Sequence, residues 1–220
     1  MQRHFDEELR DLHQDILKMG TFAEEAIVHS VEALRSQDRR LAQVVIDQDA
    51  RVDELELIID EKCLDLIARH QPMAADLRFI STGMKLNGEL ERIADIAVDI
   101  ADRVLILADE PVLKPLVDIP KLSTIAQIMV KLAIHAFIAR DAELARKVML
   151  YEPEADALRN AIHKELVEDY MVKDPSTCAR AVQLLLIGRF LERICDHATY
   201  IAEDVIYMIK GEVVKHHPER

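Results

Sequence analysis

The sequence predicts an all-α protein made of two tandem three-helix bundles. Apolar residues recur at spacings of three, four and seven along most of the 220 residues, and no window alternates with a period of two. Only five glycines and seven prolines are present, so turns are few and helices are long. The second half of the chain repeats the first at an offset of about 101–103 residues.

Breaks in the apolar pattern divide the chain into six helices. Asp38 is suited to cap the second helix, and Pro72 is suited to the first turn of the third. Residues 110–120 carry three prolines and form the clearest linker. Further breaks fall near Asp141 and Pro175. The helices are therefore expected at about residues 5–36, 38–70, 73–109, 121–139, 141–173 and 176–213.

Matching residues reveal the internal repeat. Asp38 and Pro72 correspond to Asp141 and Pro175 at an offset of 103 residues, whereas LERIAD at 90–95 corresponds to LERICD at 191–196 at an offset of 101. Three amphipathic helices can close a bundle, and this repeat is too long for a common solenoid unit. The predicted domains are 1–109, the linker 110–120, and 121–214. Pro153 should kink the fifth helix, whereas its counterpart Ala50 predicts a straighter second helix.

Charge and composition exclude several classes of function. The formal net charge of −13 argues against binding to nucleic acid or to an anionic membrane surface. Three cysteines without a CxxC motif argue against a disulfide framework and favour a reducing compartment. The N-terminus is charged, and no stretch reaches the roughly 18 apolar residues that a membrane helix needs. A cytoplasmic protein without direct membrane insertion is expected.

A stack of carboxylates is the most informative chemical feature. Glu91, Asp95 and Asp99 lie at i, i+4 and i+8, so they share one face of the third predicted helix. Such like charges cost a few tenths of a kcal/mol per pair, and a bound multivalent cation would reverse this cost. The sixth helix repeats the arrangement with Glu192 and Asp196.

The second and fifth predicted helices carry the same spacing. Glu152 and Asp156 precede the turn at Asp174 by 22 and 18 residues, and Asp196 and Glu192 follow it by the same distances. Antiparallel helices therefore place these residues at matching levels. Asp49 and Asp53 match the first stack to within two residues. The candidate metal ligands are Asp49, Asp53, Glu91, Asp95, Asp99, Glu152, Asp156, Glu192 and Asp196.

Oxygen ligands suit Mg²⁺, Ca²⁺ or Mn²⁺; iron also fits, and Zn²⁺ is less favoured. The alternative is that the carboxylates form an acidic, solvated surface. The HExxH, GxSxG and Glu-x-x-His motifs are missing, and no nucleophile accompanies the stacks. A metal-dependent hydrolase is therefore a weaker alternative, and a structural helical adaptor without metal is another.

The segments LERIADIAVDIADRV (90–104) and LERICDHATYIAEDV (191–205) resemble the PhoU family of phosphate-system regulators. The similar pattern covers about residues 4–213 and includes both halves of the repeat. The resemblance implies a cytoplasmic, non-enzymatic and homodimeric regulator in bacteria. It would link the nucleotide-binding subunit of the phosphate ABC transporter to a sensor histidine kinase, hold that kinase in its inhibitory mode, and restrain phosphate uptake.

The resemblance also implies metal binding, because the family's E(D)xxxD motifs bind metal ions or clusters on the bundle surface. By position these motifs are Glu91 with Asp95, Glu192 with Asp196, Asp49 with Asp53, and Glu152 with Asp156. Asp99 extends the first motif. Tyr200 stands where the family usually has an acidic or amide residue, so the second site is expected to be weaker or differently loaded.

Overall fold

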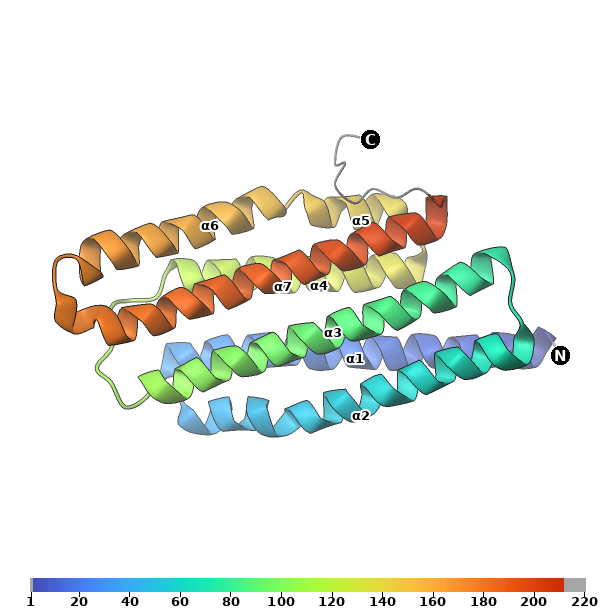
Figure 1. Ribbon diagram of the computed structural model, residues 1–220, viewed down its shortest axis with the longest axis horizontal. Coiled ribbons are helices and arrows are strands. Elements are labelled where there is room, and N and C mark those ends of the chain that lie inside the picture. The colour runs from blue at the N-terminus through green and yellow to red at the C-terminus, as the bar shows by residue number, and fades with distance from the viewer. Residues whose placement is uncertain (1, 212–220) are drawn as a thin grey trace.

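The computed structural model describes residues 2–211, and within them it contains helices and no strands (Figure 1). The predicted all-α fold is therefore confirmed. The elements are α1 (Gln2–Ser36), α2 (Arg39–His70), α3 (Ala74–Leu107), α4 (Asp118–Ala139), α5 (Ala142–Met149), α6 (Glu152–Glu165), a π-helical turn (Leu166–Met171), a 3-10 turn (Pro175–Thr177) and α7 (Cys178–Lys210). The predicted end of the last helix at 212–213, and of the second domain at 214, lie outside the described residues.

Aspartate side chains begin the second helix of each half. The Asp38 carboxylate accepts hydrogen bonds from the backbone N–H groups of Arg40 and Leu41 at 2.8 and 3.1 Å. In the second half, the Asp141 carboxylate accepts from Glu143 and Leu144 at 2.9 and 3.0 Å. These bonds satisfy N–H groups that have no partner within the helix. The cap predicted at Asp38 is confirmed, and the repeat extends to the cap geometry.

The single kinked helix predicted for residues 141–173 is wrong, because the chain breaks into α5 and α6. Pro153 lies in the first turn of α6, after the break at Leu150 and Tyr151. Proline has no N–H, and its ring collides with the carbonyl four residues earlier, so α5 cannot continue past Met149. Ala50 imposes no such break, and α2 is continuous as predicted.

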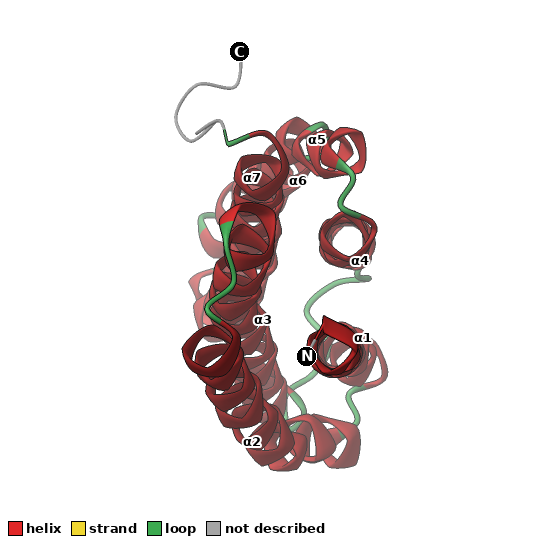
Figure 2. Cartoon of the chain, turned by 90° about the vertical axis from the view of Figure 1, so that its right-hand side faces the viewer, coloured by secondary structure: helices red, strands yellow, loops and turns green. Residues whose placement is uncertain are grey.

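The two bundles form one molecule with a shared core. Figure 2 shows α2, α3 and α7 in one curved layer, with α1 and α4 on its concave side. The α3 and α7 helices run antiparallel, since Arg78 Nε donates to the carbonyl of Met208 at 3.0 Å and the His197 ring lies 2.6 Å from the Glu89 carboxylate. One cluster of buried apolar residues extends through both halves.

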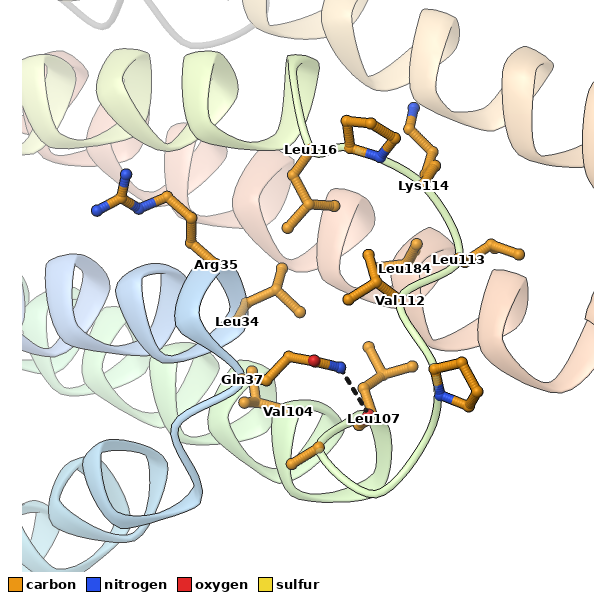
Figure 3. A pocket seen from close by; sticks show the side chains of 13 residues that line it. Leu34, Arg35, Gln37, Val104, Leu107, Val112, Leu113, Lys114, Leu116 and Leu184 are labelled. Carbon is orange, nitrogen blue, oxygen red and sulfur yellow. Dashed lines mark hydrogen bonds between the residues drawn. The ribbon is translucent and has the colours of Figure 1, made fainter.

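Residues 108–117 connect the halves and cross above an apolar cavity of about 180 Å³ (Figure 3). Leu34, Leu107 and Leu184 from three helices meet there, and the Gln37 amide donates to the Leu107 carbonyl at 3.5 Å. The predicted linker 110–120 overlaps this segment, with α4 starting earlier, at Asp118.

The α4 helix is long and apolar enough to cross a membrane by length and composition alone. However, 56% of its most apolar window is buried inside the molecule, as is usual for the core helix of a globular protein.

Candidate metal centre

The α2 and α3 helices bring the first set of predicted ligands together. Burial, together with the neighbouring carboxylates of Asp53 and Asp95, raises the pKa of Asp49 to about 6. Asp95 lies on α3 and Asp49 on α2, and the charge of Asp95 nevertheless acts on Asp49. The predicted matching of levels between the second and third helices is therefore confirmed. These carboxylates lie close enough to disfavour one another's charge.

Glu91 is perturbed more strongly. Burial, the charges of Asp95 and Glu56, and a hydrogen bond with Asp95 together raise its pKa to about 7. The largely exposed Arg92 guanidinium lies 3.8 Å from the Glu91 carboxylate. A single solvated arginine offsets only a small part of this repulsion.

Three residues of this site were missed in the sequence. The pKa of Glu56 is raised by burial and by the charges of Asp60 and Asp53. The Asn87 amide nitrogen donates to the Glu56 carbonyl at 2.9 Å and to the Asp60 carboxylate at 3.1 Å, while its buried oxygen has no hydrogen-bond partner. The spacing of Glu56 and Asp60 repeats that of Asp49 and Asp53, and this was the available signal.

These residues define the first carboxylate cluster. Its members are Asp49, Asp53, Glu56, Asp60, Glu91 and Asp95. Asp99 lies half-buried one turn beyond Asp95, and it is not among the groups that shift the pKa values of the described cluster.

The second carboxylate cluster consists of Glu152, Asp156, Glu192 and Asp196. Burial raises the pKa of Glu152, followed by the charges of Asp196 and Asp156. Burial also raises the pKa of Asp196, and the largest charge contribution comes from Glu192. The matching of α6 with α7 predicted from the turn at Asp174 is therefore confirmed.

Two arginines distinguish the second cluster from the first. Glu192 is only 6% exposed and accepts a hydrogen bond from Arg189. The Arg159 guanidinium lies 3.5 Å from Glu192 and 3.8 Å from Asp156. Arg159 occupies the position equivalent to Glu56 in the first half, and Arg189 the position equivalent to Gly88. Arginine thus supplies a positive charge at two positions where the first half has Glu56 and Gly88.

The first cluster offers the donor set of a hard cation. In the described part of the chain, no three His, Cys, Asp or Glu side chains already converge as they would around a metal ion. The carboxylates and the unpaired Asn87 oxygen are nevertheless all oxygen donors on one helix–helix boundary. A bound cation would replace their mutual repulsion with attraction.

Other reactive side chains of the described chain have ordinary structural surroundings. The His197 ring pairs with Glu89 and meets Tyr200 edge-on at 5.8 Å. Cys63 and Cys195 are buried, and burial raises the pKa of Cys63 to about 12. A thiol with so high a pKa is inert near neutral pH.

Comparison with known proteins agrees with this architecture. The PhoU domain model matches twice, at residues 16–104 and 119–205. A phosphate-specific transport system accessory protein PhoU homolog from Aquifex aeolicus is 40% identical over 209 residues, covering 95% of this chain and 94% of that protein. The homolog of the same name from Pseudomonas aeruginosa is 37% identical over 219 residues, covering 98% and 89%.

Solved structures show the same fold. The crystal structure of PhoU from Pseudomonas aeruginosa superposes with a TM-score of 0.90 at 38% identity, covering 94% of this chain and all of that one. The phosphate transport system regulatory protein PhoU from Streptococcus pneumoniae gives 0.88 at 28% identity, covering 96% and 99%. With two matching domains and relatives aligned over nearly their full length, the chain belongs to the PhoU family.

Proposed function

We propose that this protein is a negative regulator of the phosphate-starvation response. It couples the nucleotide-binding subunit of a phosphate ABC transporter to a sensor histidine kinase, and it restrains phosphate uptake when phosphate is plentiful. The observation that carries this proposal is the presence of two PhoU domains, in a chain whose relatives are named accessory proteins of phosphate transport. The protein acts by docking and not by catalysis. It works in the cytoplasm, at the inner face of the membrane where its partners lie, and forms a homodimer.

A divalent cation bound at the first carboxylate cluster supports this docking role. The raised pKa values of Asp49 and Glu91 support a site whose charge is not balanced by the protein itself. Carboxylate and amide oxygens suit Mg²⁺, Mn²⁺ or iron. By drawing α2 and α3 together at this level, the cation stiffens the surface on which a partner docks.

The second cluster binds such a cation more weakly. Arg159 and Arg189 already neutralise Glu192, and a cation would have to displace or repel them. Tyr200 in place of an acidic residue removes one further oxygen charge. The two halves therefore share a fold but differ in their affinity for metal.

Deletion of the gene in the bacterium that encodes this chain tests the regulatory role. In phosphate-rich medium, the deletion strain should express a phosphate-starvation reporter such as alkaline phosphatase, and it should take up phosphate faster than the parent. The wild-type gene supplied in trans should silence the reporter. A reporter that stays off in the deletion strain, in the absence of a paralogue, would contradict the proposal.

A further inference from the structure

The joint between the two halves contains the cavity beneath residues 108–117, which we call the linker cavity (Figure 3). Its volume is about 180 Å³. The floor consists of the buried side chains of Leu34, Val104, Leu107 and Leu184, which come from α1, α3 and α7. A molecule in this cavity would therefore touch both halves and the segment that joins them.

The linker forms the outer wall of the cavity. Pro111, Val112, Pro115 and Leu116 line it. Proline fixes φ near −65°, so the two prolines limit how far this segment can fold down into the space beneath it. Val112 is 64% exposed although it lines the cavity, so the outer wall is in contact with solvent. A small molecule can therefore enter beside Val112 without unfolding the core.

Polar contacts hold the linker in place from outside the apolar space. The Arg180 guanidinium donates to the carbonyl of Pro111 at 3.1 Å, and the Lys114 ammonium pairs with the Glu165 carboxylate at the end of α6. These contacts fix the height of the linker above the floor. Its position therefore does not depend on its own apolar side chains filling the cavity.

The polar side chains among the lining residues already have partners. Arg35 donates to both carboxylate oxygens of Glu32 at 2.8 Å, and the Gln37 amide nitrogen donates to the carbonyl of Glu110 at 3.0 Å. Lys114 is paired as described above, so neither cation offers a free charge to an anionic ligand. Burying a charged or polar group without a partner is costly. The cavity therefore favours a neutral, apolar ligand.

The volume of the cavity sets the size of that ligand. An apolar cavity of about 150 Å³ inside a protein stays dry and binds benzene. The linker cavity has a similar volume and a similarly apolar floor. Side chains around an empty space lack dispersion contacts on one side, and a ligand of matching size restores them.

We propose that the linker cavity binds a small, neutral, apolar molecule of the size of one aromatic ring or a short alkyl chain. The ligand contacts Leu34 and Leu107 of the first half, Leu184 of the second half and Val112 of the linker. The site shares no residue with either carboxylate cluster. The inference is thus independent of cation binding and of the phosphate role.

Isothermal titration calorimetry of the full-length protein with benzene tests this site. Wild type should bind benzene at one saturable site per chain. Benzoate has the same ring and a carboxylate, and it should bind at least about tenfold more weakly, because its charge would be buried without a partner.

Cavity-filling variants locate the bound benzene. Ala108 and Val112 both line the cavity, so Ala108→Phe and Val112→Phe should each weaken benzene binding at least about tenfold by occupying its space. Ala68→Phe makes a matched change on the exposed surface of α2 and should bind benzene like wild type. Circular dichroism checks folding. Val112 is exposed, so its variant still tests the site if Ala108→Phe does not fold.

Any of three results would overturn the inference. Wild type that shows no saturable binding of benzene would reject the site. Unchanged binding in the folded cavity-filling variants would place the benzene elsewhere. Benzoate that binds as tightly as benzene would show that Arg35 or Lys114 receives an anion, and it would reject the neutral ligand.

Discussion

Asp49 and Glu91 retain their protons at pH values where ordinary carboxylates are ionised, with pKa values of about 6 and about 7. Their environment penalises charge through burial and through neighbouring carboxylates on α2 and α3. The folded protein therefore favours their protonated forms more than the unfolded chain does. Their contribution to stability is complete below the unfolded pKa of about 4, and it is lost as pH rises through about 6 to 7.

This linkage predicts the effect of Asp95→Asn, which removes a charge that raises the pKa of both residues. In chelator-treated protein, the variant should be more stable than wild type at pH 7.5, by a few tenths to about 1 kcal/mol, and similar to it at pH 4. Urea unfolding at the two pH values measures this difference. Asp11→Asn, on the exposed surface of α1, should show no such dependence on pH. Equal effects of Asp95→Asn at both pH values would contradict the assigned repulsion.

Capping residues are also important at the residue scale. Asp38 and Asp141 make the same pair of hydrogen bonds at the start of α2 and α5. Asp38→Ala and Asp141→Ala should each lower the free energy of unfolding by about 1 kcal/mol, whereas the conservative Asp→Asn changes should cost less. Chemical denaturation measures both pairs. If the alanine and asparagine variants were equally stable, the side-chain caps would not contribute.

At the scale of elements, proline accounts for the main difference between the halves. The α2 helix runs unbroken through Ala50, whereas the corresponding stretch of the second half is divided between α5 and α6 before Pro153. The carboxylate motif of α6 thus begins at a helix N-terminus, while that of α2 lies within a long helix. Glu152 and Asp49 therefore occupy equivalent sequence positions in different local structures.

Exchanging the residues at these two positions should have unequal effects. Ala50→Pro should cost about 3 kcal/mol or more, because proline removes a hydrogen bond and collides with the carbonyl of Ile46 inside α2. Pro153→Ala should cost less than about 1 kcal/mol, because α6 already begins there. Urea unfolding of the two variants gives the comparison. A loss in Pro153→Ala as large as that in Ala50→Pro would contradict this account.

The sequence predicted the helices and the level matching of their carboxylates because both follow from local periodicity and turn positions. It did not predict the roles of Glu56 and Asp60 on α2 or of Asn87 on α3, because the two halves differ at these positions and the repeat therefore gives no signal there. The same limitation concealed the roles of Arg159 and Arg189, because the first half has Glu56 and Gly88 at the equivalent positions. The sequence predicted a kink at Pro153 where the structure has a break between α5 and α6, because a proline within a helical pattern can produce either one.

At the scale of the whole molecule, the two PhoU domains are joined by a common core. Phe79 of α3 stacks on Phe137 of α4 with ring centroids 4.6 Å apart. The His13 ring of α1 also stacks on Phe79, at a centroid distance of 4.5 Å. Both phenylalanines are fully buried. Such packing across the repeat boundary couples the stability of the two halves.

Phe137→Ala should therefore destabilise the entire molecule by about 3–5 kcal/mol, while unfolding remains a single transition. Hydrogen exchange should show the loss of protection in α1 and α3 as well as in α4. Leu150→Ala, at a side chain that is 76% exposed, should change stability by less than about 0.5 kcal/mol. Loss of protection confined to the second half would mean that the two domains unfold independently.

Thermal unfolding of chelator-treated protein with added Mn²⁺ tests cation binding at the first carboxylate cluster most directly. The Tm of wild type should rise with Mn²⁺ concentration, because a ligand that binds only the folded state stabilises it. Glu91→Gln with Asp95→Asn should abolish the rise, and Glu152→Gln with Asp196→Asn should preserve most of it. No rise in wild type, or an equal loss in both double variants, would contradict a cation site in the first half.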